Sequence, residues 1–534
     1  MKRMPSTGSM GGLGSDTDAG EQMAGAAGYH VKRSRLIGMI NWWHVLTTFY
    51  PHILVGLFCC LASQVTYSLV TVGLSMPVLA AREVLEGLHP VVFGMGWRST
   101  LLAVCLVYYL GRHHHPVYLV DFCVFDAPAS WRLTHEELME CMRRQGCFNE
   151  SSLSFLERIL ERSGTGPATA WPPGITRSLL KEGVKADQSV EAARAESEFV
   201  ICETVKAVLA KTGTDPRDID ILIVNCSLFS PTPSLCALVL NRFKMRHDVM
   251  SYNLSGMGCS ASPIAVELAQ SILRSYPNKT ALIVSTENLT QNLYHGNTRS
   301  MLLQNTLFRC GGAAILLSNR WRDGQRAKYK LLHVVRTQGT SDEAYNAVYE
   351  CEDENGQRGV RLSKEIVNVA GRTMEENFTV LGPYVLPLSE QAKVVKAIAF
   401  RKLCKAVVRW CKLDAADAKS KKGFFGWLAR VVPLKVPSYV PDFKRGIDHW
   451  CIHAGGRAVV DGVVNNLKLL PHHAAPSKHA LYHHGNTSSS SIWYELDYVR
   501  KHAGQRRGHR VLQVAFGSGF KCNSAVWLCL GDDD

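Results

Sequence analysis

The sequence predicts an α/β protein made of two halves of similar design, each with a mostly buried sheet, preceded by an N-terminal hairpin of transmembrane helices. The first observation behind this prediction is that residues 36–81 contain no Asp, Glu, Lys or Arg. The second is that short apolar runs typical of strands alternate with helical runs after Pro116. The third is that the alternation recurs, more loosely, beyond residue 389.

The N-terminal region divides into a head and an apolar segment. Residues 1–35 are rich in Gly, Ser, Ala and Met, which predicts a disordered head. Within residues 36–112, the run HILVGLFCCLASQVTYSLVTVGL (52–74) is longer than the ~20 residues that a helix needs to cross a bilayer. A second run, PVVFGMGWRSTLLAVCLVYYLG (90–111), is interrupted by Arg98 and, taken alone, also fits a buried core helix.

Basic residues at both outer ends of this segment predict its orientation. Lys32, Arg33 and Arg35 precede the first run, and Arg112 follows the second. Because Lys and Arg accumulate on the cytosolic side of membrane segments, we expect both ends of the hairpin to face the cytosol.

The N-terminal half is assigned to residues 113–330. Its predicted strands are short apolar runs, and its predicted helices repeat apolar residues every three to four positions. The strand-like runs are 218–227, 249–254, 280–287, 311–319 and 328–337, and the helical runs are 197–212 and 234–244.

The C-terminal half, residues 331–534, repeats the pattern. It contains a helical run near 389–412, a strand-like run at 449–455, a helix from Arg457 to Leu469 and a strand-like run at 509–519. An insert at 413–446 is basic and contains prolines, and its stretch GFFGWLARVVPLKVP (423–437) is amphipathic. This stretch fits either a helix on the membrane surface or an ordinary packed surface segment.

Composition excludes several classes of function. The 534 residues carry a formal charge of +14, which suits an anionic membrane face or a phosphate-bearing substrate. No compact Lys/Arg block interleaved with aromatic residues is present, so no nucleic-acid partner is expected. The 17 cysteines are odd in number and lack CxxC spacing, which argues against a disulfide framework or a zinc site and for a reducing compartment.

A cysteine at a turn is the first candidate for chemistry. The stretch SGMGCSASP (255–263) follows one strand-like run and precedes a helical run, so Cys259 lies near a helix N-terminus. The partial positive charge of that terminus would favour the thiolate form of the side chain. Taken singly, however, Cys259 is one of 17 cysteines and fits a small buried hydrophobic residue.

Three further stretches carry polar or small residues that suit the same chemistry. His453 ends a strand-like run before two glycines, Asn486 precedes a serine-rich turn, and AFGSGFKCNSAVW (515–527) allows a close backbone approach to a ligand. Both His453 and Asn486 can donate hydrogen bonds to a developing enolate, and the backbone N–H groups of Cys259 and Gly519 would form an oxyanion hole. A structural histidine and a turn asparagine are the alternatives for the first two, so these residues alone indicate no more than a cysteine-dependent acyl transferase.

Long collinear stretches resemble one known family. They run from the second apolar segment to the C-terminus, and the chain resembles the plant-type 3-ketoacyl-CoA synthases of the thiolase-like superfamily. The stretches that carry the resemblance are PVYLVDF (116–122), ILERSG (159–164), VNCSLFSPTPSL (224–235), YNLSGMGCSAS (252–262), STENLTQNLYHGNTRSMLLQNTLFRCGGAAILLSN (285–319), LGPYVLPLSEQ (381–391), PDFKRGIDHWCIHAGGRAVVD (441–461) and GNTSSSSIWYEL (485–496).

This resemblance implies a thiolase-like five-layered αβαβα fold and a Cys-His-Asn triad at Cys259, His453 and Asn486. It also implies a supporting role for His449. At two positions where the family has histidine, this chain has Gln338 and Tyr482. Because the triad is intact, we expect an active enzyme whose rate or substrate preference is shifted.

The implied reaction condenses a long-chain acyl-CoA with malonyl-CoA to 3-oxoacyl-CoA, CO2 and CoA, the first step of very-long-chain fatty acid elongation. It proceeds through an acyl group on Cys259, needs no metal or other cofactor and uses CoA thioesters only as substrates. The resemblance further implies a homodimer in the endoplasmic reticulum membrane, with the catalytic domain facing the cytosol. The expected partners there are a ketoacyl reductase, a dehydratase and an enoyl reductase.

Two alternatives stay open at this point. A type III polyketide synthase uses the same Cys-His-Asn logic but normally lacks the apolar hairpin. A membrane-anchored acyl-binding or scaffold protein with a weak triad belongs to a different class.

Overall fold

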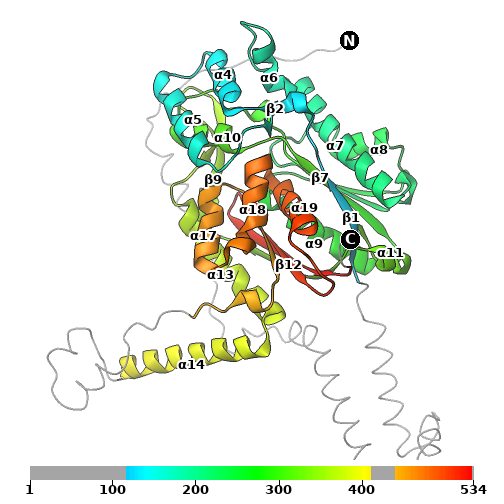
Figure 1. Ribbon diagram of the computed structural model, residues 1–534, viewed down its shortest axis with the longest axis vertical. Helices are drawn as coiled ribbons and strands as arrows, with labels where there is room; N and C mark the ends of the chain where they lie inside the picture. The colour runs from blue at the N-terminus through cyan, green and yellow to red at the C-terminus, as the bar shows by residue number, and fades with distance from the viewer. Residues whose placement is uncertain (1–115, 411–438, 532–534) are drawn as a thin grey trace, which may run out of the picture. The chain divides into compact units, whose positions relative to one another are not determined.

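One nine-stranded mixed sheet runs through the part of the chain that the computed structural model describes, residues 116–410 and 439–531 (Figure 1). Its strand order is β11-β12-β13-β8-β1-β7-β6-β4-β5. The strands are β1 (Tyr118–Val124), β4 (Ile221–Asn225), β5 (Met250–Leu254), β6 (Thr280–Thr286), β7 (Gly312–Ser318), β8 (Tyr329–Gln338), β11 (His449–Ile452), β12 (Arg510–Gly517) and β13 (Lys521–Cys529).

The pairing pattern occurs twice. In the first half β4 is parallel to β6, and β7 and β1 follow in antiparallel order. In the second half β11 is parallel to β12, and β13 and β8 follow in antiparallel order. The predicted similarity of design between the two halves is therefore visible in the topology, with β5 as an additional edge strand of the first half.

The expected separate sheets are joined into one. The junction lies between β1 and β8, which pair at Tyr118–Lys330 and Leu119–Tyr329. Two isolated sheets would each expose a row of unpaired N–H and C=O groups at this edge, and pairing satisfies them. The joint is short because only the first residues of β8 lie beside β1.

Helices cover both faces of each half of the sheet. They are α4 (His135–Gln145), α5 (Glu150–Arg162), α6 (Pro173–Leu180), α7 (Val190–Thr212), α8 (Leu235–Arg242), α9 (Ala261–Ser275), α10 (Arg299–Leu307), α11 (Trp321–Arg326), α12 (Asp342–Tyr345), α13 (Ile366–Val385), α14 (Leu388–Trp410), α17 (Arg457–Leu467), α18 (Pro471–His484) and α19 (Ser491–His502). The remaining strands form two small sheets, β2 (Arg132–Leu133) with β3 (Thr169–Ala170) and β9 (Val348–Glu352) with β10 (Arg358–Leu362).

Alternate residues of the first-half strands face different helices. Ile221, Ile223 and Ile283 pack in one core with α9 and α19. Their neighbours Leu222 and Val224 pack in another core with α7 and α8. Because successive side chains of a strand point to opposite faces, this parity places one helix layer on each side of the sheet.

The second half follows the same rule. Val511 and Trp527 join the core around α9 and α19, whereas Leu512, Val514 and Val526 pack against α13 and α17. Helices α9 and α19 are therefore shared by both halves of the sheet, in the order helix, sheet, helix, sheet, helix. This is the five-layered arrangement that the family resemblance implies.

Two regions differ from the sequence-based expectation or lie beyond it. The sequence predicts only a glycine-rich approach to a ligand at 515–527, but residues Lys521–Cys529 form β13, a buried strand inside the sheet. Because both faces of β13 are covered, its sequence lacks the alternation of polar and apolar residues that would indicate a strand. The expected head, the membrane hairpin and most of the 413–446 insert lie outside the described residues. Among residues 116–410 and 439–531, no helix is both long and apolar enough to span a bilayer.

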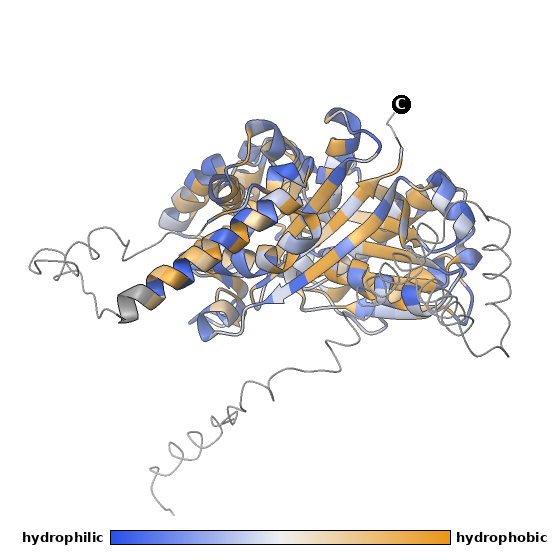
Figure 2. Cartoon of the chain, turned by 90° about the horizontal axis from the view of Figure 1, so that it is seen from below, coloured by the Kyte–Doolittle hydropathy of each residue, from blue (hydrophilic) through white to orange (hydrophobic). Residues whose placement is uncertain are grey.

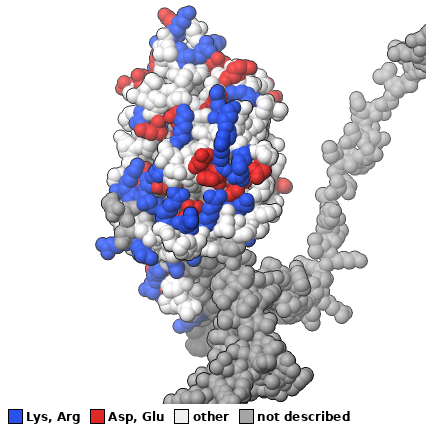
Figure 3. Space-filling model, turned by 90° about the vertical axis from the view of Figure 1, so that its right-hand side faces the viewer, with Lys and Arg blue, Asp and Glu red and all other residues white. Residues whose placement is uncertain are grey.

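The surface charge is mixed on the face shown in Figure 3. Lys and Arg side chains are interspersed there with Asp and Glu and form no continuous basic stripe.

A buried polar cluster connects the two halves behind the sheet ends. Ser285 of β6 receives hydrogen bonds from Asn225 (3.0 Å) and Ser262 (2.8 Å) and lies 2.9 Å from Ser489. Asn225 also donates to Ser489 at 2.7 Å, and Trp493 donates to Ser262 at 3.1 Å. The cluster joins residues of the first half to Ser489 and Trp493 of the second.

We expect Ser285→Ala to lower the free energy of unfolding by about 1–3 kcal/mol, because the variant leaves buried donors without their acceptor. Denaturant titration of the purified full chain in detergent, followed by tryptophan fluorescence, measures this change. Ser275→Ala on the exposed end of α9 is the matched control and should stay within about 0.5 kcal/mol of the unsubstituted protein. Equal effects of the two substitutions would contradict the role given to the cluster.

Candidate active site

Cys259 lies on a single 3-10 turn, Gly258–Ser260, between β5 and α9. Gly256 and Gly258 both have positive φ angles near 67°, which residues with a side chain adopt only with strain. A Cβ atom on Gly258 would lie 2.5 Å from the backbone nitrogen of Ser518. The glycine therefore lets the turn between β12 and β13 pack directly against the cysteine turn.

His453 follows the last residue of β11. Its backbone N–H donates to Val514 O at 2.9 Å, which continues the β11–β12 pairing by one residue. The side chain is buried, with Nδ1 2.6 Å from the Ser491 hydroxyl. Since a hydroxyl both donates and accepts, Ser491 is compatible with either neutral tautomer of the imidazole.

Asn486 lies between α18 and the 3-10 turn Ser488–Ser490. Its backbone N–H donates to Leu307 O at 3.0 Å, and its carbonyl accepts from Arg309 N at 2.9 Å. Its side-chain oxygen accepts from Ser488 N at 2.8 Å, and its side-chain nitrogen donates to Gly455 O at 3.4 Å. These four hydrogen bonds hold the backbone and the side-chain amide of Asn486 in place.

The contacts join the three loops into one site. Gly455 packs against the His453 ring, because a Cβ atom there would lie 3.1 Å from Nε2, and its carbonyl accepts from Asn486. Ser488, two residues after Asn486, lies 3.5 Å from the Cys259 sulfur through its hydroxyl. The structure thus connects the loops of Cys259, His453 and Asn486 through Gly455 and Ser488.

Sequence reasoning missed Glu287 and Ser488. Glu287 is buried just beyond the end of β6, and its carboxylate accepts hydrogen bonds from the backbone of Leu228 (2.9 Å) and from the Ser488 hydroxyl (3.0 Å). Because the same hydroxyl lies beside the Cys259 sulfur, Glu287 is connected to the nucleophile through one side chain. The signal available in the sequence was an acidic residue ending a continuous apolar strand, TALIVSTE (280–287).

Arg309 is a second residue that the sequence analysis did not select. It is fully buried, its aliphatic chain packs against Gly485, and its guanidinium stacks over Trp171 at 4.8 Å. Burial lowers its pKa to about 9. Arg309 supports the loop that carries Asn486, because its backbone N–H binds the Asn486 carbonyl and its side chain packs against Gly485.

The expected ionised cysteine is not what this geometry favours. Burial, with a further contribution from the nearby Glu287 charge, raises the pKa of Cys259 to about 12, although the Ser488 hydroxyl opposes the rise. Burial also lowers the pKa of His453 to about 4. Both groups are therefore neutral near pH 7 in the free protein. The helix-terminus effect is outweighed by the burial of the thiol, to which the nearby Glu287 carboxyl group adds.

The two supporting residues of the sequence analysis are placed differently from the triad. His449 is the first residue of β11, whereas His453 follows the last residue of that strand. The Nε2 atom of His449 lies 3.0 Å from Nδ1 of His509. Gly519 lies in the turn between β12 and β13, with φ +66°, but the residues of this turn against the cysteine turn are Gly517 and Ser518. His449 is thus not brought into the site.

Gln338 and Tyr482 are both exposed. Gln338 ends β8 opposite Lys521, and Tyr482 lies on α18. A Cβ atom on Gly166 would lie 2.8 Å from the Tyr482 ring, so the glycine makes room for the larger side chain. Within the described residues, neither side chain forms a hydrogen bond with Cys259, His453 or Asn486.

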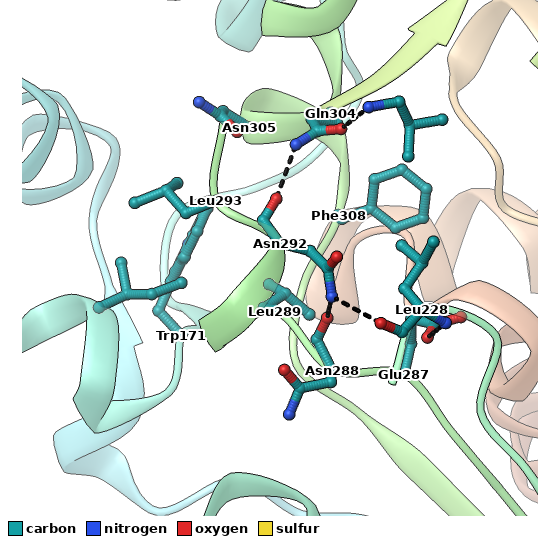
Figure 4. A pocket seen from close by; sticks show the side chains of 12 residues that line it. Trp171, Leu228, Glu287, Asn288, Leu289, Asn292, Leu293, Gln304, Asn305 and Phe308 are labelled. Atoms are coloured by element: carbon teal, nitrogen blue, oxygen red, sulfur yellow. Dashed lines mark hydrogen bonds between the residues drawn. The ribbon is translucent and has the colours of Figure 1, made fainter. Parts of the chain in front are cut away.

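A cavity adjoins the site on the side of Glu287 (Figure 4). Its polar side chains are largely paired with one another or with the backbone, as in the bond from Gln304 to Asn292 O at 2.6 Å and that from Asn292 to Asn288 O at 2.8 Å. What remains is a mainly apolar wall around a cavity of about 30 Å³. The apolar residues of this wall are Trp171, Ile175, Leu228, Leu289, Leu293, Phe308 and Val360.

Two family models match the chain. The model described as FAE1/Type III polyketide synthase-like protein matches residues 108–403. The model described as chalcone and stilbene synthases, C-terminal domain, matches residues 445–529. Together they include all three triad residues.

Curated relatives are similar over most of their length. 3-Ketoacyl-CoA synthase 5 of Arabidopsis thaliana is 45% identical over 448 residues, which cover 84% of each chain. 3-Ketoacyl-CoA synthase 4 of the same plant is 46% identical over 81% of this chain and 77% of the relative. Probable 3-ketoacyl-CoA synthase 20 of Oryza sativa subsp. japonica is 45% identical over 81% and 76%, respectively.

Solved structures support the fold. PKS-I from the brown alga Ectocarpus siliculosus matches with a TM-score of 0.56 and 16% identity, covering 78% of this chain and 98% of that chain. A fungal type III polyketide synthase, ORAS, matches with a TM-score of 0.57 and 16% identity, covering 77% and 99%.

The raised pKa of Cys259 predicts how the thiol responds to alkylation. Because the thiolate fraction grows about tenfold per pH unit below the pKa, labelling of Cys259 by iodoacetamide should rise steadily above neutral pH without a plateau. Glu287→Gln removes the negative charge that raises this pKa, and we expect labelling to be about threefold faster or more at each pH. Peptide mass spectrometry distinguishes Cys259 from the other cysteines.

The matched control is Glu203→Gln on the exposed face of α7, which should leave the labelling rate unchanged. A plateau near neutral pH would show that the thiolate is already formed. Equal rates for Glu287→Gln and the unsubstituted chain would remove Glu287 from the electrostatics of the nucleophile.

Proposed function

The chain belongs to the 3-ketoacyl-CoA synthase family, and on this premise we propose that Cys259, His453 and Asn486 carry out the family's condensation. The protein is an acyltransferase that condenses a long-chain acyl-CoA with malonyl-CoA to 3-oxoacyl-CoA, CO2 and CoA in very-long-chain fatty acid elongation. The observation that carries the assignment of residues is the hydrogen-bonded connection of their three loops through Gly455 and Ser488.

In the first half-reaction the sulfur of Cys259 attacks the acyl-CoA thioester. The His453 Nε2 atom takes the thiol proton as the new C–S bond forms, and it returns this proton to the departing CoA sulfur. The neutral state of both groups supports this proton transfer during attack, in place of a stable thiolate–imidazolium pair. The Ser491 hydroxyl would accept from Nδ1–H at this stage.

In the second half-reaction malonyl-CoA loses CO2, and its thioester oxygen takes up the negative charge of the enolate. Neutral His453 and the Asn486 amide would each donate a hydrogen bond to that oxygen. For His453 this requires the proton on Nε2, so between the half-reactions Nδ1 releases its proton to solvent and Nε2 takes one up. In the resulting tautomer Ser491 donates to Nδ1. The enolate carbon then attacks the acyl thioester, the bond to the Cys259 sulfur breaks, and the sulfur takes up one proton from solvent, which is the proton that the overall condensation consumes.

The cavity beside Glu287 supports an apolar acyl group near the sulfur. Its wall contains Phe308, adjacent to the Arg309 backbone that holds Asn486, and Leu228, whose N–H binds Glu287. We propose that the first methylene groups of the acyl chain lie against this wall, and that the cavity of about 30 Å³ widens when a longer stretch of the chain enters. Within the described residues no group of three His, Cys, Asp or Glu side chains is arranged to hold a metal ion, and CoA thioesters are the substrates of this reaction.

The alternatives of the sequence analysis have less support. The polyketide synthase structures are 16–19% identical to this chain, a level that shows a shared fold alone. The relatives at about 45% identity are 3-ketoacyl-CoA synthases. A scaffold protein without activity would not require the triad loops to be joined by hydrogen bonds.

Two alanine variants should separate the two half-reactions. Cys259→Ala should abolish transfer of radiolabelled acyl groups to the protein. Asn486→Ala should still be acylated but should lose about 100-fold or more in formation of 3-oxoacyl-CoA, because one donor to the enolate is missing. Acyl-enzyme is measured by radiolabel and product by chromatography.

Asn346→Ala, at an exposed position, is the matched asparagine control and should retain both steps. If Asn486→Ala lost acylation and condensation in equal proportion, the separate role of the amide in the second step would be wrong. Formation of a cyclised polyketide by the unsubstituted chain would favour the alternative enzyme class.

We also propose that the apolar hairpin of residues 36–112 anchors the protein in the endoplasmic reticulum membrane, with the catalytic domain in the cytosol. The charge-free run and its basic flanks support this location. A homodimer and contacts with a ketoacyl reductase, a dehydratase and an enoyl reductase are part of the same proposal. These partners would receive and process the 3-oxoacyl-CoA product.

The hairpin predicts a specific topology in microsomes. A glycosylation site in a Gly/Ser extension placed between the two apolar runs, after Glu86, should be modified because this loop would face the lumen. The same extension fused after Asp534 should stay unmodified. Modification of the C-terminal extension, or of neither, would contradict the hairpin.

A further inference from the structure

Helix α14 (Leu388–Trp410) stands away from the body of the sheet and its covering helices (Figure 1). Its first turn is bonded to the end of α13 and to Tyr439. Gln391 donates to Pro383 O and Leu386 O at the end of α13, and the buried carboxylate of Glu390 accepts from the Tyr439 hydroxyl at 2.8 Å. Figure 2 shows the helix in front of the molecule, with apolar and polar residues along its length.

One face of α14 exposes large apolar side chains. Leu388 is 81% exposed, Val395 66% and Leu403 61%. Their spacing of seven and eight residues places them on one stripe of the helix. Ile398 and Phe400, each about half exposed, lie to either side of it. A helix that packed only against the rest of this chain would bury such residues. The exposed apolar stripe therefore indicates a surface that contacts a partner.

The charges that accompany this stripe are positive. Lys396, Lys402 and Lys405 are exposed on α14, whereas its one carboxylate, Glu390, is buried at the first turn and paired with Lys393. The exposed part of the helix therefore combines apolar side chains with lysines and carries no acidic group. This combination complements an anionic lipid surface, because the lysines bind headgroups while the apolar side chains enter the boundary with the acyl chains.

We propose that α14 lies in the plane of an anionic bilayer surface, with Leu388, Val395 and Leu403 inserted among the headgroups. With 23 residues the helix is long enough to span, but its lysines and arginines make a surface orientation the stable one. The proposal goes beyond the hairpin anchor, because it states which face of the catalytic domain meets the membrane. It does not depend on the catalytic roles assigned above.

Photocrosslinking of the full-length protein in lipid nanodiscs tests the contact. Benzoylphenylalanine replaces Val395 on α14 or, as a control, Trp321, which is 75% exposed on α11. In nanodiscs that contain phosphatidylserine we expect lipid adducts at position 395 and none above background at position 321. Nanodiscs of phosphatidylcholine alone, and high salt, should lower the yield at position 395.

A second experiment reverses the charge of two lysines on α14. Lys396→Glu with Lys402→Glu should lower the lipid-adduct yield at position 395 by about 30-fold or more, the loss expected for two lysine–headgroup interactions of about fivefold each. Lys181→Glu with Lys185→Glu, two exposed lysines on another part of the surface, is the matched control and should change nothing. Acyl transfer to Cys259 should be retained in both double variants and reports that they are folded.

The adduct at position 395 identifies the occupant. A phospholipid adduct that requires anionic lipid supports the proposal. An adduct to a peptide of this chain, to a second copy or to another protein overturns it, as does the absence of any adduct in folded protein. The hairpin anchor is tested separately by the glycosylation experiment, which reports on residues 36–112 and not on α14. An unmodified hairpin loop together with a soluble catalytic domain would refute the anchor and leave the proposal for α14 standing.

Discussion

The site depends on one buried hydrogen-bond cluster in which the serine turn 488–490 enters the first half of the molecule. Ser489 accepts from Asn225 and lies within hydrogen-bond distance of Ser285, while the adjacent Ser488 contacts both Glu287 and the Cys259 sulfur. Apart from the half-buried Cys259, each partner is buried, so water cannot replace a lost bond without opening the core. The cluster therefore sets the distance between the nucleophile of one half and the Asn486 loop of the other.

The same burial controls the acid–base state of the site. It raises the pKa of Cys259 and lowers the pKa of His453, so the free protein contains neither a thiolate nor an imidazolium at these residues near pH 7. A neutral thiol limits unwanted alkylation and oxidation, and a neutral imidazole can accept a proton in one step and donate a hydrogen bond in the next. The single hydroxyl of Ser491 accommodates both tautomers. Burial thus favours a mechanism in which charge appears only when substrate is bound.

The layered architecture explains why the sequence halves form one catalytic unit. Helix α9, which follows Cys259, and helix α19, which follows the serine turn, share one core between the two parts of the sheet. A shift of either helix would change the position of the catalytic loop attached to it. By contrast, α14 contributes little to this core and exposes its apolar face, which suits a role in contact with lipid. Catalytic geometry and membrane contact are assigned to different parts of the fold.

The sequence by itself determined most of the elements, because a strand such as β6 or a helix such as α9 is specified by local apolar periodicity. It identified Cys259, His453 and Asn486 as the triad only through family resemblance, since spacing says nothing about contact across the molecule. Tertiary structure alone decided that the two sheets join at β1 and β8, that His449 lies away from the site, and that Glu287 and Ser488 belong to it. The physical reason is distance along the chain. Ser488 and Cys259 are 229 residues apart, and both their contact and the resulting pKa depend on how the whole chain packs.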